Sequence, residues 1–204
     1  MLQLITLVIF SYIIGSVPSA YIAGRLRKSI DIRKAGTGNV GATNTLIVIG
    51  PTIALIVYVF DLLKGLMPVL MAREIIGTDL SMGLCGLAAI LGHDYPSCLR
   101  VTGGKGVATT TGAGFGLNAN VMWMVIFAWF IILVPVTNYF IIASLVSMLL
   151  IPILMYYYKL SMTLVIFGWL FFLVGLFTHR KDVVRILKGQ HPKAFESAKK
   201  YFKR

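Results

Sequence analysis

A glycine-rich segment with a single lysine, Gly103-Gly104-Lys105-Gly106, lies between two strongly apolar stretches of the chain. Glycines let consecutive backbone N–H groups converge on one anion, while the lysine adds a compact positive charge and a following helix would add the positive end of its dipole. The segment is not a P-loop, which needs four residues between its glycines and Ser or Thr after the lysine. It predicts a phosphate-binding loop, with a plain turn at a membrane surface as the alternative.

A second polar loop, residues 31–44, places hydroxyl and amide side chains among glycines. This composition supplies backbone and side-chain donors at close approach, which suits phosphate oxygens or a glycerol hydroxyl. A flexible polar linker is the alternative. The residues that we expect at a substrate are Thr37, Gly38, Asn39, Gly41, Thr43 and Asn44.

Polar residues also interrupt two apolar stretches. Ser16 and Pro18 break the first stretch, which indicates either a packing kink or a pocket wall. Asp61 and Lys64 are helical neighbours at i, i+3, and each would be costly in lipid without a partner. We expect them to pair with each other or to face a polar cavity, so both an ion pair and a site-lining role stay open.

Two histidines lie where they could join such a site. His93 precedes Lys105 by about a dozen residues, so one surface pocket could hold both, although a histidine at a helix end is more often structural. His179 and Arg180 follow the last apolar stretch and could each donate to a phosphate or a carboxylate. Membrane anchoring explains Arg180 better than it explains His179.

These residues must be positioned by membrane helices. Of the 204 residues, 58% are hydrophobic and only 13% are charged, and the mean hydropathy is +0.86. Such a chain has too little polar surface to cover a soluble globule. We therefore expect an all-α integral membrane protein that forms a single polytopic domain over residues 1–204, with a basic cytoplasmic tail at 179–204. Cys85 and Cys98 lack metal-ligand spacing and are predicted to be buried thiols.

Seven apolar segments could cross the bilayer, and they are residues 4–24, 52–72, 80–99, 107–117, 121–136, 138–158 and 161–177. Cations cluster at 25–34, at Arg100 and Lys105, and at 180–204. The positive-inside rule places these clusters in the cytoplasm, with the N-terminus outside, the C-terminus inside and the active-site loops on the cytoplasmic face. Because 107–117 and 121–136 are short, five spans with a re-entrant pair is the alternative to seven.

Taken together, the motifs resemble the bacterial acyl-phosphate:glycerol-3-phosphate acyltransferases, the PlsY family, along almost the whole chain. The segments that carry the resemblance are residues 15–18, 31–44, 61–65, 92–96, 103–109 and 179–180. The resemblance implies a multi-pass enzyme of the bacterial cell membrane that moves a fatty acyl group from acyl phosphate to sn-glycerol 3-phosphate. The products would be lysophosphatidic acid and phosphate. It also implies no metal, no nucleotide cofactor, no acyl-CoA, and a cytoplasmic partner that makes acyl phosphate.

The residues fit that reaction, because an acyl phosphate is an activated mixed anhydride and the protein has mainly to hold two anions together and stabilise an oxyanion. We see no convincing nucleophile arrangement, so direct attack without an acyl-enzyme is favoured. The base could be His93, His179 or the phosphate of the donor. Lys105 is expected at phosphate and His179 at the acceptor, so the predicted catalytic residues are Lys105, His179 and His93. The other substrate positions are Gly103, Gly104, Gly106, Arg180, Asp182, Ser16, Asp61 and Lys64.

Several positions depart from the family pattern. The family usually carries Ser, Arg, a basic residue, Asn and an acidic residue at the positions of Thr37, Ile47, Thr102, Asp182 and His191. A charge-assisted hydrogen bond contributes on the order of 1.5 to 3 kcal/mol. The missing cation at Ile47 would therefore weaken binding roughly tenfold to a hundredfold, unless Arg33 or Arg100 replaces it. We expect a diverged paralogue with altered substrate preference or weakened activity.

Two other classes of function remain open. A non-catalytic relative that binds lipid or a partner would explain the departures, and a small transporter of a phosphorylated solute would explain Asp61 and Lys64 within the membrane. Against transport, the polar motifs gather on one face of the membrane. Membrane lipids surround the chain in every case, and its charge gives no reason to invoke nucleic acid.

Overall fold

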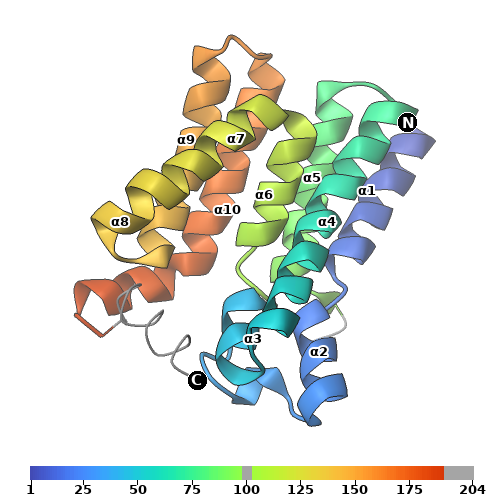
Figure 1. The fold of residues 1–204 in the computed structure, drawn as a ribbon. Coiled ribbons are helices and arrows are strands. Elements are labelled where there is room, and N and C mark those ends of the chain that lie inside the picture. Colours follow the sequence, from blue (N-terminus) through green and yellow to red (C-terminus); the bar gives the residue numbers. More distant parts are fainter. Residues whose placement is uncertain (98–102, 191–204) are drawn as a thin grey trace. The chain divides into compact units, whose positions relative to one another are not determined.

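The computed structural model describes residues 1–97 and 103–190, and every regular element within them is a helix (Figure 1). The chain divides into two compact units, Met1–Leu117 and Asn118–Arg204. The single domain predicted for residues 1–204 stays a prediction. Other predictions fall on residues outside the described ranges, namely Cys98, Arg100, Thr102, His191 and the tail from residue 191 onward.

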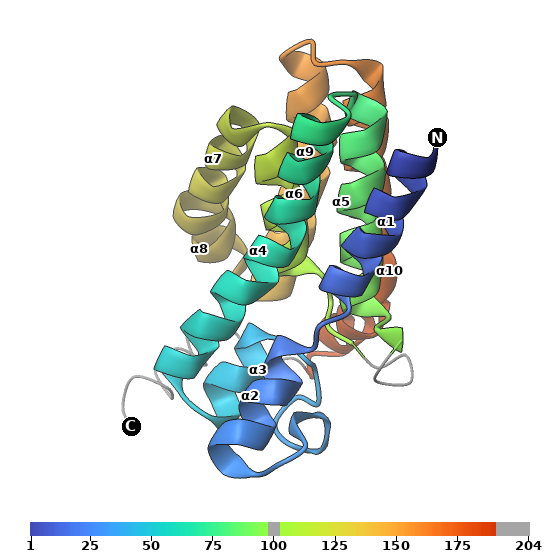
Figure 2. The same ribbon diagram turned by 90° about the vertical axis from the view of Figure 1, so that its right-hand side faces the viewer.

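In the first unit, four helices run side by side and shorter elements lie at one end of them (Figure 2). The four are α1 (Leu2–Gly15), α4 (Pro51–Ile75), α5 (Asp79–Asp94) and α6 (Val107–Leu117). The shorter elements are α2 (Ser19–Lys28), a 3-10 turn (Ile32–Lys34) and α3 (Ala42–Val48). The loop that carries Lys105 connects α5 to α6, and the loop of residues 31–41 connects α2 to α3.

Glycines allow α4 and α6 to pack with their backbones in contact. A Cβ added at Gly65 would overlap a carbonyl of Thr109, and one added at Gly112 would overlap a carbonyl of Leu62. Small residues bring helices together in this way where lipid offers no hydrophobic drive for association. Farther along, Gly116 faces Val69, so the two helices run in the same direction. Because α4 and α6 are parallel, α5, which joins them along the chain, must run in the opposite direction.

The second unit contains three long helical runs. The first combines α7 (Ala119–Ala128), a π-helical turn (Trp129–Leu133) and α8 (Val134–Thr137). The other two are α9 (Phe140–Tyr157) and α10 (Met162–Leu187), which pack against each other. They are antiparallel, because Gly175 faces Met148 while Gly168 faces Pro152.

The predicted segments correspond to observed helices, with two differences in length. Among the described residues, five helices are long and apolar enough to cross a membrane, and they are Leu2–Lys28, Pro51–Ile75, Ala119–Thr137, Phe140–Tyr157 and Met162–Leu187. The break predicted in the first of them is present between α1 and α2. Helix α5 ends at Asp94, before the predicted residue 99. Helix α10 continues past the predicted residue 177, so His179 and its neighbours lie on the same helix as the last apolar segment. The cytoplasmic tail predicted at 179–204 stays a prediction.

Candidate active site

The loop that carries Lys105 folds back onto the end of α5. The Gly104 N–H donates to the carbonyl of His93 at 3.1 Å. Gly106 has a φ of +66°, a left-handed conformation that favours glycine, and it passes the chain into α6. Its carbonyl accepts from Thr110 N at 2.7 Å. The loop therefore lies against His93, and Lys105 is half-buried within the loop. A single surface pocket that holds both His93 and Lys105 stays a prediction.

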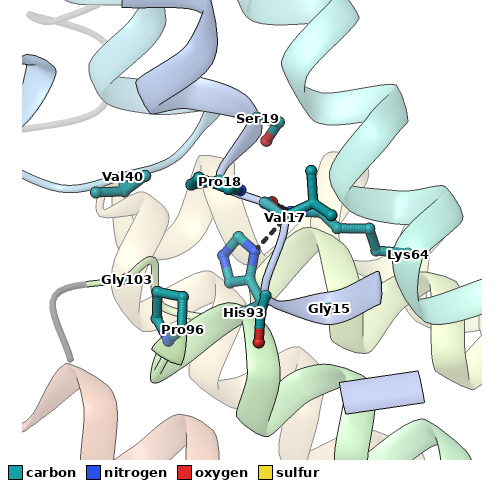
Figure 3. A pocket seen from close by; sticks show the side chains of 10 residues that line it. Gly15, Val17, Pro18, Ser19, Val40, Lys64, His93, Pro96 and Gly103 are labelled. Atoms are coloured by element: carbon teal, nitrogen blue, oxygen red, sulfur yellow. Dashed lines mark hydrogen bonds between the residues drawn. The ribbon is translucent and has the colours of Figure 1, made fainter. Parts of the chain in front are cut away.

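A buried polar network lies behind this loop (Figure 3). Lys64 Nζ is 2.6 Å from Asp61 Oδ1, so the predicted ion pair is confirmed. The same ammonium donates to Val17 O at 2.7 Å, and it lies 3.4 Å from His93 Nδ1. Ser19 Oγ donates to Asp61 Oδ1 at 2.5 Å. The broken first helix and helices α4 and α5 therefore meet at one charged centre.

The pocket at this centre is small. Its walls include Ser16, Val40 and Gly103, together with Lys64 and His93. Its volume of about 10 Å³ is room for roughly one water molecule. A substrate phosphate needs more space than this pocket provides. The substrate contacts predicted for Ser16, Asp61 and Lys64 stay predictions. The sequence predicts the break at Ser16, whereas nothing in it singles out Ser19, because the partner of Ser19 is 42 residues away.

Asn44 organises the first polar loop from inside. Its side chain is fully buried. Its amide nitrogen donates to the carbonyls of Ile32, Ala35 and Asn39 at 3.0, 3.1 and 2.9 Å, and its oxygen accepts from Thr37 N at 2.8 Å. Both amide hydrogens are engaged by the chain itself. The structure therefore gives Asn44 a positioning role in place of the substrate contact predicted from the sequence.

Of the other predicted residues of this loop, Gly41 is buried and the rest lie closer to its surface. Thr37 and Thr43 are exposed, and Asn39 is half-buried. Thr37 Oγ1 accepts from Asn39 N at 3.3 Å. Gly38 has a φ of +75°, so a glycine is required for this turn. The hydroxyl groups predicted to meet a substrate are consequently accessible, whereas the amide of Asn44 is not.

Arg33 is already engaged within the loop. Its guanidinium forms an ion pair with Asp31 at 2.7 Å and lies 5.2 Å from the centre of the Tyr21 ring. The hydrogen bonds that Arg33 donates lower the pKa of the Asp31 carboxyl to about 2, and the same pairing raises the pKa of Arg33. The Asp31 carboxylate therefore neutralises much of the positive charge that Arg33 could offer a substrate phosphate in place of the cation missing at Ile47.

Lys28 is a cation that sequence analysis did not single out. Its Nζ donates to the carbonyl of Val48 at 2.6 Å, at the end of α3 and beside Ile47. A cation is favourable at the C-terminal end of a helix. The partner lies 20 residues away in the chain, so only the folded loop reveals the contact.

In the second unit, α10 separates the predicted residues into two faces. His179 and Asp182, at i and i+3, are both buried. Arg180 is exposed, and its guanidinium donates to Phe177 O at 2.6 Å and lies 4.0 Å from the Phe177 ring. Arg180 therefore does not share the face of His179.

The hydrogen bond of His179 selects its tautomer. Nδ1 lies 2.8 Å from the carbonyl of Gly175. Because a carbonyl can only accept, Nδ1 carries the hydrogen, and Nε2 is the basic nitrogen of the neutral ring. Within its own unit, His179 thus has the form that a general base requires.

Comparison with known proteins finds one family. A family model described as glycerol-3-phosphate acyltransferase matches residues 5–189. The glycerol-3-phosphate acyltransferase of Parasynechococcus marenigrum (strain WH8102) is 38% identical over 200 residues, which cover 97% of this chain and 92% of the relative. The protein of the same name from Prochlorococcus marinus (strain NATL1A) is 36% identical over 191 residues, covering 90% and 94%.

Two solved structures are also similar to this chain. Both are crystal structures of PlsY (YgiH), an integral membrane glycerol 3-phosphate acyltransferase. The glycerol 3-phosphate form has a TM-score of 0.89 and 30% identity, and the match covers 94% of this chain and 95% of the other. The lysophosphatidic acid form has a TM-score of 0.87 and 28% identity, covering 96% and 98%.

Proposed function

The chain belongs to the glycerol-3-phosphate acyltransferase family, and we infer from this that it is a multi-pass enzyme of the bacterial cell membrane. It transfers a fatty acyl group from acyl phosphate to sn-glycerol 3-phosphate in membrane phospholipid synthesis. The products are lysophosphatidic acid and phosphate. The observation that carries this conclusion is the family match over residues 5–189, which spans both polar loops and the His179 region.

We propose that the loop of Lys105 holds a substrate phosphate. The Gly104 N–H already donates to His93 O, so the donors proposed for the phosphate are the Lys105 ammonium and the backbone N–H groups at the start of α6. This helix of 11 residues adds its positive end to the charge of the lysine. Thr37, Asn39 and Thr43 lie at or near the surface of the other loop, where they suit a second polar headgroup. Holding the two anionic substrates together, against their repulsion, would supply much of the rate enhancement.

In the proposed reaction, the 1-hydroxyl of glycerol 3-phosphate attacks the acyl carbonyl directly. A new ester bond forms, the bond between the acyl carbon and the phosphate oxygen breaks, and phosphate leaves with its electron pair. The hydroxyl proton passes to a base. We propose His179 for this role, because Nε2 is the basic nitrogen of its neutral ring; His93 and the phosphate of the donor are the other candidates.

We propose seven crossings, with the N-terminus outside and the C-terminus in the cytoplasm. Helices α4 and α6 are parallel, and α5 joins them along the chain in the opposite direction. This course supports the view that all three helices cross the membrane. At 1.5 Å per residue, the 16 residues of α5 and the 11 of α6 reach about 24 and 16 Å. Both are shorter than the roughly 30 Å hydrocarbon core. Their ends would therefore lie within the protein, which recesses the Lys105 loop below the cytoplasmic surface.

The donor substrate must be made elsewhere. Acyl phosphate is a reactive mixed anhydride, so we propose a cytoplasmic enzyme that forms it as a functional partner.

The function is tested with purified protein in detergent or a lipid mesophase, supplied with palmitoyl phosphate and glycerol 3-phosphate. Wild-type protein should release phosphate and form lysophosphatidic acid, whereas Lys105→Gln should lose most of this activity. Lys159→Gln is the matched control, because this exposed lysine lies in the turn between α9 and α10. Folded wild-type protein that forms no product would favour a different acceptor or a non-catalytic relative.

A further inference from the structure

The last two residues of α5 support the Lys105 loop from the protein interior. His93 and Asp94 are both buried. A Cβ added at Gly104 would overlap His93 Nε2, and one added at Gly106 would come within 2.9 Å of Asp94 Oδ1. The backbone of the loop therefore rests directly on these two side chains. Any shift of the His93 ring must move the loop.

The opposite edge of the His93 ring is held by the ion pair of α4. Nδ1 lies 3.4 Å from Lys64 Nζ and 3.7 Å from Asp61 Oδ1. The exposed fractions of Asp61, Lys64 and His93 are 2%, 7% and 8%. Water therefore has little access to these contacts. Buried polar networks of this kind hold their side chains in one arrangement.

The ammonium of Lys64 also determines which nitrogen of His93 is basic. An ammonium can only donate, so a hydrogen bond between Lys64 Nζ and His93 Nδ1, at 3.4 Å, requires Nδ1 to accept. The Asp61 carboxylate, at 3.7 Å from the same nitrogen, lies beyond hydrogen-bond distance. In the neutral ring, the hydrogen is then on Nε2, on the edge that faces Gly104. The basic nitrogen of His93 points away from the loop, which is the wrong direction for taking a proton from a substrate there.

We propose that Asp61, Lys64 and His93 form a positioning network that fixes the Lys105 loop in its phosphate-binding conformation. His93 is a positioning residue in this network and does not act as the base. The inference rests on the proposed function, because it assigns a task to groups behind the same site. Ser19 and the Val17 carbonyl complete the network by tying it to the break between α1 and α2.

The first test compares two histidine variants in the acyl-transfer assay. His93→Gln should lower kcat/KM roughly 10- to 100-fold through displacement of the loop. The loss should appear mainly in KM, with the pH profile of kcat unchanged. His179→Gln, the matched control, should lower kcat roughly 10²- to 10⁴-fold, as expected for removal of a general base. Loss of kcat together with one limb of the pH profile in His93→Gln would overturn the inference.

A second test examines the shared contact through a double variant. Lys64→Met should raise the KM in the same way as His93→Gln. The kcat/KM of the double variant should be no lower than that of the more impaired single variant, because both changes release the ring at position 93 from its contact with Lys64. Fully additive losses would mean that Lys64 does not act through His93. If wild-type protein is inactive with both substrates, the proposed function fails, and these comparisons are not reached.

A third test needs no variant to fold. In wild-type protein labelled with ¹⁵N-histidine, the ring of His93 should show hydrogen on Nε2 and a lone pair on Nδ1. The opposite tautomer would contradict the inference whatever the kinetic results.

Discussion

Replacement of the buried amide of Asn44 by alanine should disorder the first polar loop. In Asn44→Ala, the carbonyls of Ile32, Ala35 and Asn39 lose their shared donor, and Thr37 N loses its acceptor. The residue has no exposed surface, so its loss acts first on the loop and only through the loop on a substrate.

The size of the effect follows from the hydrogen bonds lost. The two amide hydrogens, which are shared among three carbonyls, and the one bond that the amide oxygen accepts together provide about three bonds' worth of stabilisation. At about 0.5 to 1.5 kcal/mol net for each bond, the loop should lose about 1.5 to 4.5 kcal/mol. This corresponds to a shift of roughly 10- to 2,000-fold in the equilibrium between ordered and disordered loop. The same factor is the upper limit for the loss in kcat/KM.

Two measurements on the same samples test this reasoning. Acyl-transfer kinetics should show the loss in kcat/KM, and hydrogen exchange should show faster exchange of the amides in residues 32–40. Asn118→Ala is the matched control, because this amide accepts one hydrogen bond, from Val121 N at 3.0 Å, at the start of α7. It should lower helix stability by about 1 kcal/mol and leave loop exchange unchanged.

A particular combination of results would refute the positioning role of Asn44. If Asn44→Ala raises KM strongly while exchange in residues 32–40 stays at the wild-type rate, the amide contacts the substrate directly. The substrate contact predicted from the sequence would then be correct.

Three further predictions concern other parts of the first unit. Lys64→Met leaves Asp61 charged and buried, which should cost about 3 to 5 kcal/mol and lower the Tm in detergent by roughly 6 to 20 °C; adding Asp61→Asn should recover much of this, and no recovery would argue against an uncompensated charge. Carbon-13 NMR should give Asp31 a pKa of about 2. Its pairing with Arg33 is then intact at pH values above the ordinary carboxyl pKa of 3.8 and is lost as the pH falls through about 2. Arg33→Gln should raise this pKa towards 3.8, and a pKa of 3.8 in wild-type protein would contradict the pairing. Gly112→Ala places a methyl group against a carbonyl of α4 and should destabilise by about 1 to 3 kcal/mol; an unchanged Tm would show that α4 and α6 separate easily.

Local features of the sequence predicted much of the architecture. Long apolar runs predicted the helices, five of which are long and apolar enough to cross a membrane among the described residues, and Pro18 predicted the break in the first of them. The i, i+3 spacing predicted the pair of Asp61 and Lys64. Each of these predictions depends on residues within a few helical turns of one another, where backbone geometry alone sets which side chains are neighbours. The end of α10 was predicted too early, because a helix continues into polar residues once one of its faces is buried, as at His179 and Asp182.

The composition and motifs by themselves determined the class of protein, the phosphate-loop hypothesis and the family resemblance. Only the tertiary structure decided which polar residues face inward. Asn44 resembled its exposed neighbours in the sequence, yet it is the buried centre of its loop. His93 was one candidate base, yet it touches Lys64 on one edge and the loop at Gly104 on the other. The physical reason is that these contacts join residues between 5 and 29 positions apart that no regular helical spacing relates. Only the folding of the loops and the packing of the helices brings their partners together.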